Sequence, residues 1–127
     1  MKITLASDAA APSDEHVVRL KNDIDPRSIA LDQVRVVELE FPKFTDGRAF
    51  SQAYLLRRRL GFRGEIRATG DVLVDQLLQM KRSGFDAAVL RADQDLQQAT
   101  VQLAFFDQFY QGDATSKVAR SNAGAAA

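Results

Sequence analysis

The sequence of 127 residues has no cysteine and a single histidine, His16. Without cysteine the chain cannot form disulfide bonds, offer a thiol nucleophile or hold an iron–sulfur cluster through its own thiolates. One histidine also argues against a zinc or non-haem iron site built from several imidazoles, and we expect His16 to be exposed to solvent. We therefore predict that the chain alone binds no metal and no cofactor, so that a redox role would require a partner.

An excess of charge of either sign is also missing, because 17 basic and 17 acidic side chains give a formal net charge of zero. Proteins that bind nucleic acids or anionic membranes usually rely on a basic excess. No apolar run approaches the ~20 residues that span a bilayer, and residues 1–5 are too short for a signal peptide. We expect a cytoplasmic protein that binds neither nucleic acid nor a membrane.

Both ends of the chain differ in composition from its middle. Residues 6–15 are mostly small and polar, and residues 112–127 end in a stretch of alanine and glycine without apolar periodicity. Segments of this kind bury too little apolar surface to offset the entropy of ordering. We therefore predict a flexible arm over residues 1–15, a single α/β domain over residues 16–111 and a disordered tail over residues 112–127.

Between these ends, strand-like and helix-like patterns alternate. Strand patterns cover residues 16–20, 34–41, 65–68 and 87–90, and helical spacing of apolar residues covers residues 49–60, 72–83 and 96–110. Strands that alternate with helices form parallel sheets through right-handed crossovers. A closed barrel of eight such units takes ~250 residues. We predict a small open, mainly parallel sheet of three to four strands, built from consecutive βα units like part of a barrel.

Local signals mark where the predicted helices begin and end. Gly61 and Gly84 each follow a basic segment, and glycine after cationic residues commonly ends a helix. Asp25 before Pro26 predicts a short helix capped by the aspartate. In the helix over residues 49–60, the apolar stripe runs through Leu56 to Leu60, so we expect both side chains to be buried.

Charged residues gather in the loops that follow three of the predicted strands. In parallel sheets the carboxyl ends of the strands meet at one edge, where ligands commonly bind. Arginine can hold an oxyanion with two hydrogen bonds, and helix N-termini add backbone N–H donors. The candidate ligand-binding residues at this rim are Lys43, Asp46, Gly47, Arg48, Arg67, Gly70, Asp71 and Arg91, and the candidate catalytic residues are Asp46 and Asp71.

A structural role accounts for the same residues. Asp46, Asp71 and Asp93 also suit helix N-caps, each stabilising by ~1 kcal/mol, and the arginines could pair with them. The glycines also suit tight turns. The sequence has no glycine-rich dinucleotide motif, no Walker loop and no nucleophile elbow. Anion binding and loop fixation both remain open.

The predicted helix from Leu96 to Tyr110 carries an unusually wide apolar surface. Phe105 and Phe109 add a second edge beside the stripe that faces the core. Core packing explains most of it, but an aromatic face on a terminal helix also suits a subunit contact. A monomer and a homodimer formed through this helix remain open.

Several segments resemble the signature of a bacterial family of unknown function whose genes lie beside those of assimilatory sulfite reductase. The resemblance spans roughly residues 17–111 and rests on residues 41–48 (FPKFTDGR), Ser51, residues 55–57, 60–61, 64–73 (GEIRATGDVL), 75–77, 84–87 (GFDA) and 110–111. The positions that match its most distinctive motif are Asp46, Gly47, Arg48, Arg67, Gly70, Asp71, Asp75 and Gln76. The chain departs from the family in a shorter N-terminal region and in Ser83, where many relatives have cysteine.

The resemblance implies a pathway but no reaction. Members are labelled oxidoreductases or accessory proteins of sulfite reduction, and no catalytic residues are established for them. The partner implied is sulfite reductase or another enzyme of sulfur assimilation. Serine at position 83, where many relatives have cysteine, weakens any thiol-based proposal for the whole family.

Three hypotheses follow. The leading one is an accessory protein of assimilatory sulfate and sulfite reduction, which binds a redox partner or a small oxyanion at the rim. The second is an enzyme that acts on an anionic metabolite at the same rim, with Asp46 or Asp71 as acid or base. The third is a structural module that dimerises through the last helix.

Overall fold

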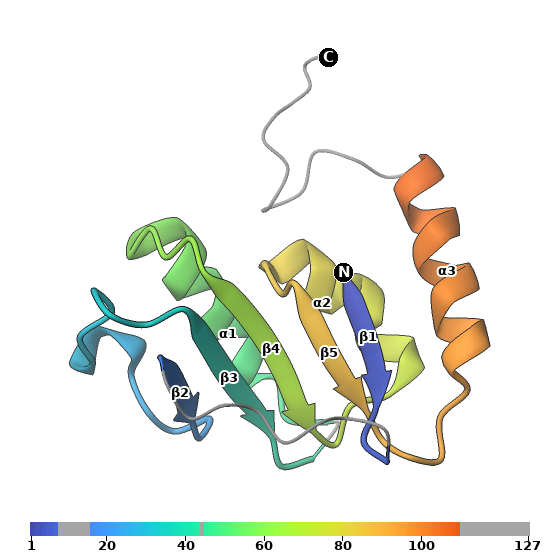
Figure 1. The fold of residues 1–127 in the computed structure, drawn as a ribbon, viewed down its shortest axis with the longest axis horizontal. Helices are drawn as coiled ribbons and strands as arrows, with labels where there is room; N and C mark the ends of the chain where they lie inside the picture. The colour runs from blue at the N-terminus through green and yellow to red at the C-terminus, as the bar shows by residue number, and fades with distance from the viewer. Residues whose placement is uncertain (8–15, 44, 110–127) are drawn as a thin grey trace.

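The structure, a computed structural model, describes residues 1–7, 16–43 and 45–109, apart from the side chains of residues 106–109. In this part of the chain, five parallel strands form one sheet in the order β1–β5–β4–β3–β2 (Figure 1). The strands are β1 (Lys2–Leu5), β2 (Val17–Leu20), β3 (Val36–Phe41), β4 (Glu65–Gly70) and β5 (Ala87–Leu90). The predicted α/β class with an open parallel sheet is confirmed, and β2 to β5 lie side by side in chain order.

The strand β1 corrects the prediction for the beginning of the chain, because it lies within the stretch expected to be a flexible arm. Its four residues pair in register with β5, from Lys2 opposite Ala87 to Leu5 opposite Leu90. So short a strand carries little alternation, and its partner lies far along the chain. The sheet therefore has five strands instead of three to four. Residues 8–15 and the predicted tail lie outside the described residues.

Helices cover one face of this sheet. In Figure 1, α1 and α2 lie behind the strands and α3 stands beside β1, with which it is in contact. The helical elements are η1 (Pro26–Ser28), α1 (Arg48–Tyr54), η2 (Leu55–Arg59), η3 (Val74–Gln76), α2 (Leu77–Ser83) and α3 (Leu96–Phe109). The helix predicted over residues 72–83 begins at Val74, as the 3₁₀ turn η3 that leads directly into α2, because Leu73 has an extended backbone at φ −113° and ψ 152°.

The predicted helix boundaries are confirmed where a local signal marked them. Gly61 and Gly84 follow η2 and α2 with φ values of +67° and +112°, in the left-handed region that glycine favours. The side chain of Asp25 accepts a hydrogen bond from the backbone N–H of Arg27 (2.9 Å) and caps η1 as expected. At α3 the cap is Asp95, whose carboxylate accepts from the backbone N–H of Gln98 (3.1 Å).

The second half of the first helix is wider than an α-helix. η2 is a π-helical turn, in which the backbone N–H of Leu60 donates to the carbonyl of Leu55 five residues earlier (3.0 Å). The extra residue per turn rotates the apolar stripe. Leu56 is fully buried as predicted, but Leu60 is 36% exposed, which corrects the prediction for that side chain.

The core lies between the sheet and the helices and follows from strand alternation. Inward-facing strand residues are almost completely buried: Val37, Leu39, Phe41, Ile66, Ala68, Ala88 and Leu90. Facing them are Ala49, Ala53, Leu56, Leu77, Met80, Phe85, Ala99 and Leu103. Because successive strand residues point to opposite faces, the remaining strand positions lie on the face away from α1 and α2.

Candidate functional site

The carboxyl ends of the strands form the rim, at the lower edge of the sheet in Figure 1. Arg91, just after β5, donates to Asp71 at the end of β4 (2.9 Å) and to Asp93 in its own loop (2.7 Å). The backbone N–H of Asp71 donates in turn to the carbonyl of Phe41 in β3 (2.7 Å). The structure therefore brings Asp71 and Arg91 together as predicted, and their contacts fix three adjacent strand ends.

Asp46 and Arg48 form a second group at the rim. One oxygen of the Asp46 carboxylate accepts from Nδ2 of Asn22 (2.6 Å), and the other accepts from the backbone N–H of Arg48 (3.1 Å). The carboxylate thereby joins the loop after β2 to the start of α1. The guanidinium of Arg48 approaches Asp46 only to 3.9 Å and remains 68% exposed, and Lys43 in the same loop is also exposed.

The two glycines of the predicted site differ in what they require. Gly70 has φ +94°, and a Cβ atom built there would lie 2.5 Å from the carbonyl oxygen of Phe41. The close approach of β4 to β3 therefore requires glycine at this position. Gly47, just before α1, has φ −90°, which other residues adopt.

Gln52 of α1 lies under this part of the rim and was not predicted from the sequence. Its Nε2 donates to the carbonyls of Lys21 (2.9 Å) and Ile24 (2.8 Å), which holds the loop after β2 against the helix. Its Oε1 is buried and has no hydrogen-bond partner among the described residues. The only sequence signal was a polar residue one turn after Arg48, on a helix that packs on the sheet.

Arg67 does not belong to the rim, which corrects the predicted site. It lies inside β4 between the buried Ile66 and Ala68, so its side chain points to the face away from α1 and α2. There it contacts Glu38 (2.8 Å) and Glu65 (2.7 Å). The alternation Glu-Ile-Arg-Ala already predicts this orientation. The strand was predicted to end at residue 68, but it runs to Gly70, which leaves Arg67 three residues short of the rim.

Arg67 is the centre of an ionic row that crosses the sheet. At one register position across the sheet, the strands in the order β1, β5, β4, β3 and β2 carry Lys2, Ala87, Arg67, Glu38 and Arg19. Neighbouring charges alternate in sign, with Lys2 2.8 Å from Glu65 and Arg19 3.0 Å from Glu38. Burial alone would raise the pKa of Glu65, but hydrogen bonds from Lys2 and Arg67 outweigh it and hold that pKa below its usual value.

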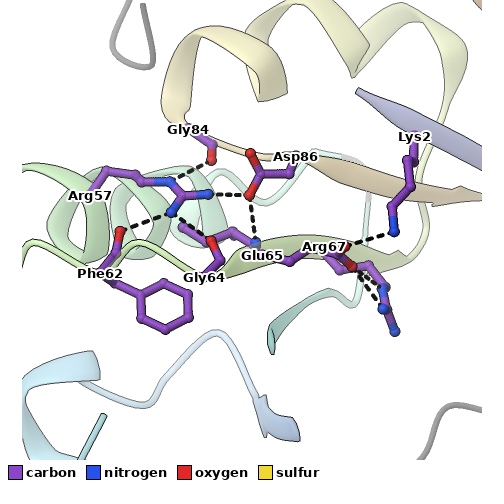
Figure 2. Close-up of polar contacts among 9 residues, drawn as sticks. Lys2, Arg57, Phe62, Gly64, Glu65, Arg67, Gly84 and Asp86 are labelled. Carbon is purple, nitrogen blue, oxygen red and sulfur yellow. Dashed lines mark hydrogen bonds and ion pairs between the residues drawn. The ribbon is translucent and has the colours of Figure 1, made fainter. Parts of the chain in front are cut away.

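A third polar group lies at the opposite edge of the sheet, around Arg57 of η2 (Figure 2). Its guanidinium donates to the carbonyls of Gly84 (3.0 Å), Phe62 (2.9 Å) and Gly64 (2.7 Å). It also forms an ion pair with Asp86, whose carboxylate accepts from the backbone N–H of Ile66 (3.0 Å). One side chain thus joins η2, the start of β4 and the segment that leads into β5.

The contacts of the rim carboxylates limit the chemistry they can perform. Hydrogen bonding from Arg91 holds the pKa of Asp93 below its usual value, and contacts with Asp93 and then Asp71 raise the pKa of Arg91. Both oxygens of Asp46 are engaged by neighbouring groups. The contacts of Asp46 and Asp71 join neighbouring loops of the rim.

Other sequence predictions can be located on the fold. His16 is exposed as expected, with Nδ1 2.9 Å from the carbonyl of Gln33. On α3, Val101 is 62% and Phe105 59% exposed, whereas Tyr110 lies outside the described residues, so dimerisation stays a prediction.

The described residues contain no group of three or more acidic or histidine side chains that could hold a metal ion. None of their helices has the length and apolarity to cross a membrane.

Comparison with known proteins matches most of the chain to a family model. A family model described as a bacterial protein of unknown function (DUF934) matches residues 17–120. This agrees with the resemblance to a bacterial family of unknown function noted in the sequence. No curated protein and no solved structure matches the chain.

Proposed function

Because the chain belongs to this bacterial family of unknown function, DUF934, we propose its function from its own geometry. We propose that it is a non-catalytic accessory protein of assimilatory sulfite reduction that binds a small oxyanion, such as sulfite or sulfate, at the loop between β3 and α1. The pathway follows from the sequence resemblance to proteins encoded beside sulfite reductase, and the kind of ligand follows from the charges of the loop.

One observation carries this proposal. In the β3–α1 loop, the carboxylate of Asp46 turns inward to Asn22 and to the backbone N–H of Arg48, whereas Lys43 and the guanidinium of Arg48 are exposed. The loop therefore presents its cations outward while its acid is occupied. Two cations within a short, anchored loop suit an oxyanion, which arginine can hold with paired hydrogen bonds.

The same geometry favours binding over catalysis. Asp46 and Asp71, the two carboxylates considered for acid–base chemistry, contact Asn22 and Arg91 and join neighbouring loops. A substrate would have to displace these contacts before either carboxylate could act. The enzymatic alternative therefore has less support than the binding role.

The test measures thermal stability of the purified protein with sulfite, sulfate and phosphate at equal ionic strength. A ligand present at a hundred times its dissociation constant stabilises the folded state by ~2.7 kcal/mol, which shifts the melting temperature by several degrees in a domain of this size. We expect the shift to disappear in Arg48→Ala and to weaken in Lys43→Ala. Arg59→Ala, which removes an exposed cation at the opposite edge, should keep it.

Two outcomes would contradict the proposal. If no oxyanion raises the melting temperature, or if Arg48→Ala responds like the unaltered protein, the loop is not an anion site. The pathway is tested separately, by purifying tagged protein from cells that grow on sulfate as the sulfur source. If neither sulfite reductase nor another enzyme of sulfur assimilation co-purifies, the assignment to sulfite reduction fails.

A further inference from the structure

The edge of the sheet opposite the rim is rich in exposed arginine. Arg58 and Arg59 belong to η2, Arg63 lies between η2 and β4, and Arg35 precedes β3. The backbone brings them to one corner, because the carbonyl of Arg35 accepts from the N–H of Glu65 (2.8 Å) and Arg57 binds the carbonyl of Gly64, next to Arg63. We call these four exposed residues the arginine edge; it lies at the upper left in Figure 1, where β3 and β4 begin.

Ion pairing distinguishes these four arginines from most other arginines that the structure describes. The arginines of the rim and of the ionic row each have a carboxylate neighbour, as do Arg27 and Arg57. Within residues 16–43 and 45–105, no carboxylate pairs with Arg35, Arg58, Arg59 or Arg63. Although the chain has a net charge of zero, four exposed arginines without a carboxylate partner in those ranges therefore lie at one corner.

Apolar groups are interspersed with these cations. Tyr54 is 49% exposed and carries the guanidinium of Arg58 over its ring at 5.5 Å. Leu60 is exposed because the π-helical turn rotates it away from the core. Tyrosine and arginine are enriched in the buried centres of protein interfaces, so this composition is typical of a contact with another protein.

Contacts within the fold give little reason for arginine at these four positions. A cation in the last helical turn interacts favourably with the helix dipole, but Arg57 already occupies that turn with its guanidinium bound to three carbonyls. Arg35 and Arg63 lie outside the helix. Like charges held close together in water are unfavourable, and a partner of opposite charge would relieve that repulsion.

We propose that the arginine edge is a docking surface for a protein that presents acidic side chains mixed with apolar ones. This surface is separate from the rim and does not depend on the anion site there. A nucleic acid fits less well, because high affinity for phosphate backbones usually draws on a larger basic area and a basic excess in the domain. The exposed Leu60 and Tyr54 are complementary to an apolar side chain and not to a phosphate.

Two labelled peptides of fourteen residues and equal negative charge test the proposal by fluorescence anisotropy. One alternates glutamate with leucine and phenylalanine, the other alternates glutamate with serine, and an oligonucleotide of fourteen thymidines serves as the competing probe. We expect the apolar acidic peptide to bind more tightly than the other two probes. The double variant Arg59→Glu, Arg63→Glu should weaken this binding at least ~10-fold, because two attractions become repulsions.

The matched control is Lys21→Glu, Arg27→Glu, which makes the same change in net charge near η1 and should alter the affinity less than ~2-fold. If the Arg59, Arg63 double variant melts below the unaltered protein, Arg59→Gln with Arg63→Gln replaces it. Equal weakening in both double variants would overturn the proposal, since only net charge would matter. Tighter binding of the serine peptide or of the oligonucleotide would also overturn it, as would an absence of binding at low ionic strength.

Discussion

Replacing Arg57 with lysine should destabilise the protein strongly even though the charge is kept. The guanidinium satisfies three backbone carbonyls and an ion pair with Asp86 from a side chain that is only 13% exposed. A lysine ammonium is a compact point charge and cannot reach all four acceptors, which the guanidinium contacts through three different nitrogens. The remaining carbonyls would lose partners where water has limited access.

The size of the effect follows from these contacts. A hydrogen bond to a charged group contributes ~1.5–3 kcal/mol, and breaking a buried ion pair costs ~3–5 kcal/mol. Asp86 is 44% exposed, so water can replace part of what it loses. We therefore expect the free energy of unfolding to fall by ~3 kcal/mol, and the melting temperature by ~12–24 °C.

Urea denaturation followed by circular dichroism measures this loss. Arg58→Lys is the matched control, because the neighbouring side chain is exposed and stacks on Tyr54; it should change stability by less than ~0.5 kcal/mol. Asp86→Asn, which retains an acceptor oxygen, should cost ~1 kcal/mol. The reasoning is refuted if Arg57→Lys unfolds within ~0.5 kcal/mol of the unaltered protein or if the control loses as much.

Two further predictions concern a glycine and a carboxylate. Gly84→Ala should lower the free energy of unfolding by at least ~2 kcal/mol, because the alanine Cβ would lie 2.5 Å from Cγ of Arg57 and the backbone φ is +112°. Gly61→Ala is the control: at φ +67° with open space around it, the substitution should cost only ~1 kcal/mol in the same urea titration. Because the folded pKa of Glu65 is lowered, its contribution to stability should be fully present above the unfolded pKa near 4.5. It should decline below that pH and be lost as pH falls through the lower folded pKa. Urea titrations between pH 3 and pH 7 should therefore show a weaker pH dependence for Glu65→Gln, and an unchanged dependence would contradict the role of the ionic row.

The fold was predictable from the sequence where the signals are local. Strand alternation, the glycines after η2 and α2 and the aspartate before Pro26 act within a few residues, and each lies where the sequence placed it. The strand β1 was not predictable in this way, because its pairing with β5 joins distant parts of the chain. The exposure of Leu60 was missed because nothing in the sequence distinguishes a π-helical turn from an α-helical one.

The candidate site was predictable in part. The loops after β3, β4 and β5 lie at one edge because parallel strands require it, and the contact between Asp71 and Arg91 joins the last two of them. Arg67 was assigned to this edge by distance along the chain, although its position between two buried residues places it on the sheet face. The sequence of three consecutive arginines did not reveal that Arg57 alone is bound by backbone carbonyls, because that depends on where the chain returns at Gly64 and Gly84.

The place of β1 in the sheet affects the order in which the protein can assemble. Each of β2, β3 and β4 pairs with the strand that follows it in the chain, so these contacts can form while the polypeptide leaves the ribosome. β1 is synthesised before all of them, yet it pairs only with β5. Contacts of such long sequence separation form slowly, so β1 takes its place in the sheet after β2, β3 and β4, although it is made before them. Until residue 90 has emerged, β4 is an open edge of the nascent sheet that other chains could pair with. α3 contacts β1, so it can reach its final place only after β1 has paired with β5.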